Sequence, residues 1–174
     1  MKSLIKRYGK WALITGASSG IGFEFAKNLA IQGFNLVLVA RRSEQLNTQA
    51  LEFKSLYNID VRVVAIDLTE PNAVRTLYDN VSGLDIGLII PSVDEMGEFL
   101  TRDYAALERM IRLNVNVPTE LIHMFGSRLT SREKSGVILV SSLFGYQGIP
   151  HFSTYAATKA YILMLGEALN VELR

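Results

Sequence analysis

The chain has 174 residues, 49% of them hydrophobic and 20% charged, and its formal net charge at pH 7 is +1. We expect residues 1–174 to form a single globular domain, because this length and composition support one sizeable core. The near-neutral charge gives no electrostatic basis for binding nucleic acid. The lack of cysteine excludes disulfides and cysteine-ligated zinc, and we expect no metal site.

The first ten residues are basic but contain no apolar stretch of the kind found in a signal peptide. Their charges, on Lys2, Lys6, Arg7 and Lys10, are either a solvated leader or a weak contact with anionic lipid, and we favour the solvated leader. No apolar run in the sequence is long enough to span a bilayer. We therefore expect no membrane association and a cytoplasmic location.

Residues 11–22, WALITGASSGIG, are the most informative stretch. An apolar strand over residues 12–14 ends at a turn with glycines at Gly16, Gly20 and Gly22, and a helix is predicted over residues 21–31. Such a turn gathers free backbone N–H groups at the positive end of a helix dipole, where phosphate binds. The alternative is a glycine turn that has a purely structural role.

The remaining elements alternate along the chain, with Gly33 ending the first of these helices. Strands are predicted over residues 35–40, 61–66, 86–90 and 136–141. Helices are predicted over residues 43–57 with Ser43 as N-cap, from Thr69 and Pro71 to 78, over 104–129 with a bend near Pro118, and over 154–173. Apolar strands alternating with helices predict an α/β fold, a doubly wound parallel sheet of order 3-2-1-4-5 with helices on both faces. Ligands bind such sheets at the carboxyl ends of the strands.

Several motifs in this order resemble those of the short-chain dehydrogenase/reductase family, whose fold is Rossmann-like. The glycine turn is similar to the family's cofactor turn, and Asp67-Leu68 after the third strand is similar to its adenine-contacting pair. Ser142, thirteen positions before Tyr155 (155 − 142 = 13), and Tyr155-x-x-x-Lys159 complete the set, with Asn114 at the place of the family's structural asparagine. The resemblance implies cofactor contacts from these residues: Gly16, Ser18, Ser19, Gly20, Ile21, Gly22, Asp67, Leu68, Tyr155 and Lys159.

The spacing of Tyr155 and Lys159 has a chemical reason. Residues four apart project from the same face of a helix, and an ammonium group near a phenol favours the phenolate and lowers its pKa from about 10. Tyr155 could then exchange a proton with a substrate oxygen while hydride moves to or from a nicotinamide. Ser142 would donate a hydrogen bond to that oxygen. In the family the lysine also holds the nicotinamide ribose, and the asparagine anchors a water.

Each of these residues also has a simpler interpretation. Tyr155 and Lys159 could be a solvated pair, Ser142 could merely end a strand, and Asn114 could be a buried polar group satisfied by backbone. We favour the catalytic interpretation because all of them occur together and in order.

The choice of cofactor depends on the end of the second strand. An acidic residue there would bind the ribose hydroxyls of NAD, but the chain has Arg41 and Arg42. Two arginines suit the additional 2′-phosphate of NADP, so we expect NADP. The alternative is that both are solvated loop charges.

The chain departs from the family in two places. The family usually has Asn-Asn-Ala-Gly after the fourth strand, and counting back from Asn114 places Ile89-Ile90-Pro91-Ser92 there, which predicts altered cofactor contact. Family members also have about 250 residues, a usual size for one domain. The resemblance therefore implies that this chain is part of a longer protein whose last strands and substrate loop lie outside it.

We therefore expect an oxidoreductase that transfers hydride between NADP(H) and a carbonyl or alcohol substrate, with Asn114, Ser142, Tyr155 and Lys159 as the catalytic residues. An apolar substrate is suggested by five residues that could equally be core or interface: Leu143, Phe144, Tyr146, Ile149 and Phe152. The alternative is a cofactor-binding or scaffold relative without turnover. The resemblance also implies a homodimer or homotetramer.

Overall fold

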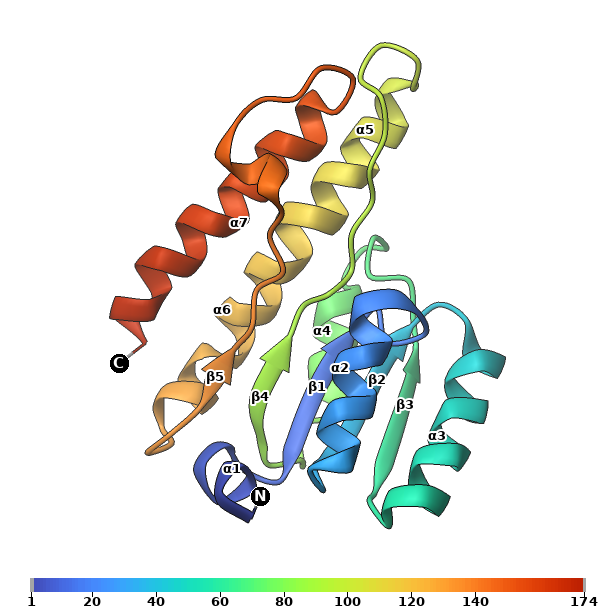
Figure 1. Cartoon of the computed structure of the whole chain (residues 1–174), viewed down its shortest axis with the longest axis vertical. Coiled ribbons are helices and arrows are strands. Elements are labelled where there is room, and N and C mark those ends of the chain that lie inside the picture. The colour runs from blue at the N-terminus through green and yellow to red at the C-terminus, as the bar shows by residue number, and fades with distance from the viewer. Residues whose placement is uncertain (1, 174) are drawn as a thin grey trace.

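A five-stranded parallel sheet is the centre of the computed structural model, which describes residues 2–173 (Figure 1). The strands are β1 (Trp11–Thr15), β2 (Asn35–Ala40), β3 (Val61–Ala65), β4 (Ile86–Ile90) and β5 (Gly136–Val137). Their order is β3-β2-β1-β4-β5, and every neighbouring pair is parallel. This arrangement confirms the predicted α/β class and strand order.

The helices connect the strands and cover both faces of the sheet (Figure 1). They are α1 (Lys2–Tyr8), α2 (Gly20–Ile31), α3 (Ser43–Tyr57), α4 (Ala73–Asn80), α5 (Tyr104–Ile111), α6 (Val117–Thr130) and α7 (Ser153–Glu172). A π-helical segment, Arg112–Asn116, joins α5 to α6, and a 3-10 turn, Leu143–Tyr146, precedes α7. None of the helices among the described residues is both long and apolar enough to cross a membrane.

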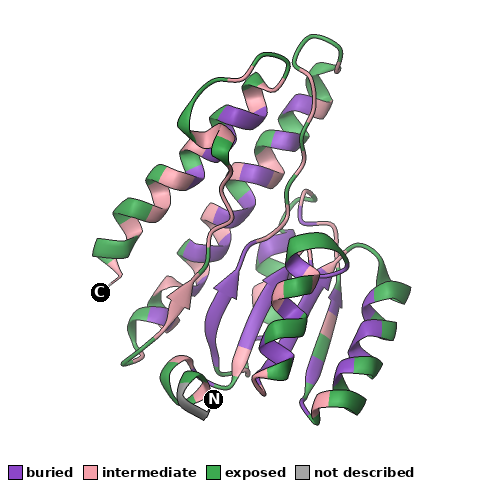
Figure 2. Ribbon diagram, in the orientation of Figure 1, coloured by how far each residue is buried: buried purple, intermediate pink, exposed green. Residues whose placement is uncertain are grey.

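The core lies on the two faces of the sheet because the central strands are almost entirely apolar and buried on both sides (Figure 2). On one face Ile14 and Leu38 pack with residues of α2 and α3, including Phe53. On the other face Leu13 and its neighbours pack with α4 and α6, including Phe125. Alternate residues of one strand therefore serve different helix layers.

The predicted helix over residues 104–129 is interrupted by the π-helical segment immediately before Pro118. Proline has no N–H, so Pro118 cannot donate the α-helical bond to the carbonyl of Asn114. Instead the N–H of Val117 bonds to the carbonyl of Arg112 five residues back. The chain widens for one turn at this point, and Asn114 lies inside the widened turn.

Three element boundaries differ from the sequence-based expectation. β5 ends at Val137 rather than at residue 141; Val137 pairs with Ile89, and β4 itself ends one residue later, at Ile90. Helix α4 begins at Ala73 rather than near Thr69, because Thr69 donates to Asp67 in the preceding turn. The N-cap of α3 is Arg42, and Ser43 is already helical.

The N-terminal segment was expected to be a solvated leader, and this expectation is wrong for part of it. Residues Lys2–Tyr8 form helix α1, and the side chains of Ile5 and Tyr8 pack against the core cluster that α2 and α3 share with the sheet. The basic side chains of Lys6 and Arg7 remain exposed. The segment therefore combines a small apolar contact with a charged outer face.

Candidate active site

A cleft of about 540 Å³ lies at the carboxyl ends of the strands, where ligands of doubly wound sheets bind. It extends from the turn after β1 to α7, and its wall contains residues from the carboxyl end of each of the five strands or the segment that follows it, from three α-helices and from the π-helical segment. The lining residues are Gly16, Ser18, Ser19, Gly20, Ile21, Ala40, Arg41, Arg42, Ile66, Asp67, Leu68, Thr69, Ser92, Val93, Asp94, Arg109, Leu113, Val140 and Lys159.

The glycine turn between β1 and α2 is packed so closely that two of its glycines admit no side chain. A Cβ at Gly22 would lie 2.5 Å from the carbonyl oxygen of Gly16, and a Cβ at Gly16 would lie 2.8 Å from the carbonyl oxygen of Ser92. Gly20 is different, because a Cβ there would meet no heavy atom within 4 Å, although its φ of +57° favours glycine. The turn is therefore closed toward the sheet and open toward the cleft.

The end of β2 is tied to this turn by Arg42. One guanidinium nitrogen of Arg42 donates to Ser18 Oγ at 2.9 Å and to Ser19 Oγ at 2.8 Å. From α3, Gln49 Nε2 donates to the backbone oxygen of Ser18 at 3.0 Å. Ser19 is the N-cap of α2, yet its side chain accepts no hydrogen bond from the helix. A positive charge and uncapped backbone N–H groups therefore face the same part of the cleft.

Arg41 lies on the other side of β2 and pairs with Asp67 at the end of β3, at 3.5 Å. Partial burial of Asp67 acts to raise its pKa, but two hydrogen bonds from Thr69 and the charge of Arg41 outweigh burial and hold the pKa below its usual range. Leu68 is buried and also lines the cleft. Asp67 is therefore held as a carboxylate beside the cleft.

At the opposite end of the cleft, α7 presents Tyr155 and Lys159 one turn apart. Both are buried as residues, at 7% and 3% exposure. The Lys159 ammonium donates to the backbone oxygen of Val140 at 3.0 Å, and the Lys159 carbonyl accepts from Ser141 Oγ at 2.8 Å. Helix α7 thereby holds the segment that follows β5, in place of the sheet pairing that was expected there.

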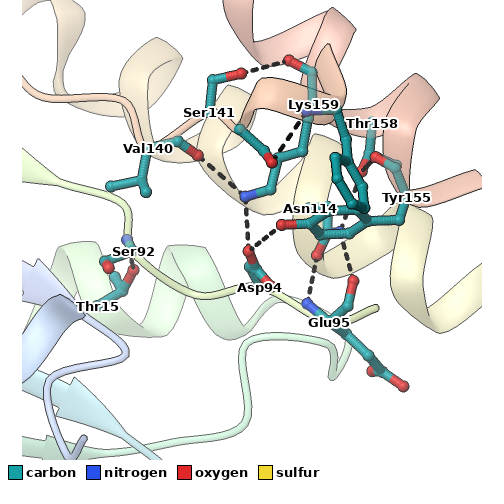
Figure 3. Close-up of polar contacts among 12 residues, drawn as sticks. Thr15, Ser92, Asp94, Glu95, Asn114, Val140, Ser141, Tyr155, Thr158 and Lys159 are labelled. Carbon is teal, nitrogen blue, oxygen red and sulfur yellow. Dashed lines mark hydrogen bonds and ion pairs between the residues drawn. The ribbon is translucent and has the colours of Figure 1, made fainter. Parts of the chain in front are cut away.

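The Asp94 carboxylate contacts both of these side chains (Figure 3). Its Oδ2 is 2.8 Å from Lys159 Nζ and accepts a hydrogen bond of 3.2 Å from Tyr155 Oη. Burial and the negative charge of Asp94 raise the pKa of Tyr155, and only the Ser142 hydroxyl acts to lower it. The pKa shift is opposite in direction to the one expected from Lys159 alone, because burial and the Asp94 carboxylate both favour the phenol.

Sequence reasoning missed Asp94, and the position of β4 explains why. The four residues expected to replace Asn-Asn-Ala-Gly were 89–92, but β4 ends at Ile90, so Ile89 and Ile90 are buried strand residues. The four residues that follow the strand are 91–94, and Asp94 stands at the position of the motif's glycine. Counting forward from the end of the strand would have identified it.

Asn114 joins this loop to the helices. It is 2% exposed, its Oδ1 accepts from the N–H of Glu95 at 2.8 Å, and its Nδ2 donates to the carbonyl of Glu95 at 2.8 Å. Nδ2 also lies 3.1 Å from Thr158 Oγ1 on α7. The structure therefore fits the simpler interpretation at least in part, because backbone groups satisfy this buried amide (Figure 3).

Ser142 caps the 3-10 turn, where its Oγ accepts from the N–H of Phe144 at 3.2 Å. Four of the five candidates for an apolar wall separate into two groups, and the fifth, Ile149, is half-buried. Phe144 and Phe152 pack around Tyr155, with ring centroids of Phe144 and Tyr155 6.0 Å apart. Leu143 and Tyr146 are exposed, at 83% and 74%.

The predicted site residues thus fall into two sets. Most of them line one cleft: Gly16, Ser18, Ser19, Gly20, Ile21, Arg41, Arg42, Asp67, Leu68 and Lys159. Gly22, Asn114, Ser142 and Tyr155 are not among the lining residues. Arg109 of α5 was not predicted; it lines the cleft and pairs with Glu95 at 2.7 Å.

Comparison with known proteins gives consistent matches over almost the whole chain. Residues 10–174 match the family model described as short chain dehydrogenase. The chain is 33% identical over 172 residues to a 7beta-hydroxysteroid dehydrogenase of Collinsella aerofaciens, covering 98% of this chain and 65% of that protein. It is 35% identical to a very-long-chain 3-oxoacyl-CoA reductase of Scheffersomyces stipitis, covering 100% of this chain and 54% of that protein. The chain therefore spans about two thirds or less of the length of these relatives.

Two solved structures extend the comparison to the fold. A structure from a study of 7beta-hydroxysteroid dehydrogenase stereoselectivity superposes with a TM-score of 0.92 at 33% identity, covering 97% of this chain and 66% of that one. A short-chain dehydrogenase from Sphingobium yanoikuyae in complex with NADPH has a TM-score of 0.88 at 32% identity, covering 94% of this chain and 65% of that one.

Proposed function

Because the chain belongs to the short-chain dehydrogenase family, we propose that it is the cofactor-binding and catalytic part of an NADP-dependent oxidoreductase that interconverts a carbonyl and an alcohol. The observation that carries the proposal is a single cleft with the glycine turn and Arg42 at one end and Lys159 at the other. One elongated ligand with phosphates at one end and hydroxyls at the other suits such a cleft.

The cradle of the glycine turn fits a dinucleotide. The position of Gly20 is open. The Ser19 side chain accepts no hydrogen bond from the first N–H groups of α2, and the Arg42 guanidinium lies beside Ser19. Backbone N–H groups would bind the pyrophosphate, and Arg42 would bind a 2′-phosphate. The NADPH complex of the Sphingobium protein supports this choice of cofactor.

At the other end of the cleft, Tyr155 of α7 would transfer the proton between the protein and the substrate oxygen. When bound, the nicotinamide supplies or accepts the hydride. Tyr155 would donate its phenol proton to the developing alkoxide during reduction, Ser142 would position the substrate oxygen, and Lys159 would hold ribose hydroxyls. Asn114 would fix the loop after β4 relative to α7, through its bonds to Glu95 and its contact with Thr158.

The substrate class follows from the surroundings of the proton donor. Phe144 and Phe152 flank Tyr155, and Leu143 and Tyr146 are exposed beside them. We therefore propose an apolar carbonyl or alcohol, a choice supported by the steroid and long-chain acyl names of the two relatives. A homodimer or homotetramer remains part of the proposal.

The test is turnover with NADPH on a panel of apolar ketones, with Tyr155→Phe as the comparison. We expect Tyr155→Phe to lower kcat by at least about a hundredfold, since general acid catalysis contributes roughly 10²–10⁴. Thermal unfolding of the variant should be nearly unchanged. Turnover retained by Tyr155→Phe would contradict the assigned role.

A second candidate function is cofactor binding without turnover, and Asp94 is the observation that favours it. A carboxylate that holds both Tyr155 and Lys159 keeps the two groups from a substrate and a ribose. Saturable NADPH binding without oxidation of NADPH over the whole panel would support this candidate over the first.

A further inference from the structure

One oxygen atom of Asp94 contacts both the Lys159 ammonium and the Tyr155 hydroxyl of α7 (Figure 3). Oδ2 lies 2.8 Å from the Lys159 ammonium and 3.2 Å from the Tyr155 hydroxyl. The Lys159 side chain is 4% exposed, and its other acceptor is the backbone oxygen of Val140. A buried ammonium needs a partner of this kind, because a lone buried charge is strongly unfavourable.

The same oxygen biases Tyr155 toward its protonated form. The phenol donates its hydrogen to Asp94, and ionisation would remove this bond and bring two negative charges together. Burial acts in the same direction, and the pKa of Tyr155 is raised.

The backbone around Asp94 is fixed on both sides. The N–H of Ser92 donates to Thr15 Oγ1 at 3.1 Å, and the backbone of Glu95 is held by Asn114 through two bonds of 2.8 Å. The Asp94 side chain itself is 34% exposed and lines the cleft. Removing the carboxylate from Lys159 therefore requires a side-chain rotation and no movement of the loop.

We propose that Asp94 is a positioning residue that holds Tyr155 as the phenol and keeps Lys159 engaged inside the protein, so that a nicotinamide ribose reaches Lys159 only by displacing the Asp94 carboxylate. The part that concerns the ribose rests on the proposed function. The effect of Asp94 on the Tyr155 proton does not rest on it.

The other charged groups near Asp94 are already paired with one another. Its neighbour Glu95 pairs with Arg102, which precedes α5, and with Arg109 of α5, each at 2.7 Å. From α7 the facing groups are Tyr155 and Lys159 themselves, and the π-helical segment contributes the neutral Asn114. The segment after β5 contributes the hydroxyls of Ser141 and Ser142. Among these groups, Asp94 is the carboxylate in contact with Tyr155.

The first test compares two probes that reach different lengths along the cleft. Calorimetry would measure the binding of NADPH and of adenosine 2′,5′-bisphosphate, which lacks the nicotinamide ribose, to the wild-type protein and to Asp94→Asn. We expect Asp94→Asn to bind NADPH roughly threefold to tenfold more tightly, the range that an ion pair of this burial supports, and to bind the bisphosphate with unchanged affinity. Unchanged or weaker NADPH binding, or an equal gain for both probes, would overturn the proposal.

The second test needs no cofactor. Tyrosinate absorbance would be titrated in the wild type and in Asp94→Asn, each with a Tyr155→Phe partner, so that the difference isolates Tyr155. We expect Asp94→Asn to move the Tyr155 midpoint to lower pH, whereas Glu98→Gln, an exposed carboxylate of the same loop, should leave it in place. An unmoved midpoint in Asp94→Asn would overturn the proposal.

The two tests separate the failure of this inference from the failure of the proposed function. If neither the wild type nor any variant binds NADPH, the proposed function fails. The titration still decides whether Asp94 raises the pH at which Tyr155 loses its proton. If Asp94→Asn unfolds at a pH below the Tyr155 midpoint, Asp94→Gly, which restores the family's residue, replaces it. The Tyr155 midpoint of Asp94→Gly should also move to lower pH.

Discussion

The two ends of the cleft are built in different ways. At the end near α2, the framework of the site is backbone, with the Arg42 side chain beside it: a glycine turn without room for Cβ atoms at Gly16 and Gly22, and the first N–H groups of a helix. At the end near α7, the site consists of side chains: Tyr155, Lys159 and the carboxylate of Asp94.

This difference determines how each end responds to a change of sequence. A backbone site depends on the geometry of the turn, because a side chain that does not fit distorts the turn and affects folding. A side-chain site keeps its shape when one residue changes, but its charge and proton affinity change with it, as the raised pKa of Tyr155 shows. We therefore expect substitutions of the turn glycines to appear first in stability, and substitutions of the side chains at either end of the cleft to appear first in binding and pH dependence.

The largest expected effect is that of Gly22→Ala. A Cβ at this position would lie 2.5 Å from the oxygen and 2.8 Å from the carbonyl carbon of Gly16, and these backbone atoms cannot move without shifting the turn. We expect a loss of about 2–3 kcal/mol in the free energy of unfolding, measured by urea denaturation, together with weaker NADPH binding.

Gly126→Ala in α6 is the matched control. A Cβ there would meet no heavy atom within 4 Å, so we expect a gain of about 0.5–1 kcal/mol from helix propensity. Equal stability of Gly22→Ala and the wild type would show that the turn is looser than the backbone contacts indicate.

The ends of the cleft also differ in how well they could be predicted. The strand order and the glycine turn could be predicted because they depend on local apolar runs and on glycine spacing. Asp94 could not be assigned by counting back from Asn114, because that count assumes a fixed loop length between β4 and α5. The end of β4 at Ile90 sets the position instead. The π-helical segment was foreseen only as a bend, since Pro118 indicates that an α-helical bond is lost but not which wider bond replaces it.

The second prediction concerns the two arginines after β2. Arg42 contacts both serines of the turn, whereas Arg41 is 63% exposed and pairs with Asp67. We expect Arg42→Ala to weaken NADPH binding by roughly tenfold to a hundredfold, the value of a charge-assisted contact, and Arg41→Ala to weaken it less. Binding of NADH to Arg42→Ala should change little.

Dissociation constants for both cofactors would check this prediction. If Arg42→Ala weakens NADPH and NADH equally, then Arg42 acts by holding Ser18 and Ser19 in place and does not distinguish the 2′-phosphate.

The smallest expected effect is on stability and concerns Asp67, a second carboxylate that lines the cleft. Hydrogen bonds from Thr69 and the charge of Arg41 lower the pKa of Asp67 despite partial burial. The folded protein therefore holds this proton less tightly than the unfolded chain. The resulting stabilisation is present above the ordinary aspartate pKa of about 3.9 and is lost as the pH falls through the lowered value.

We expect the stability difference between the wild type and Asp67→Asn to be below about 1 kcal/mol near neutral pH, because the Arg41 partner is exposed. In acid the difference should shrink, as urea denaturation at several pH values would measure. A difference that does not vary with pH would mean that Thr69 binds the amide as well as it binds the carboxylate, so that the charge of Asp67 contributes nothing to this end of the cleft.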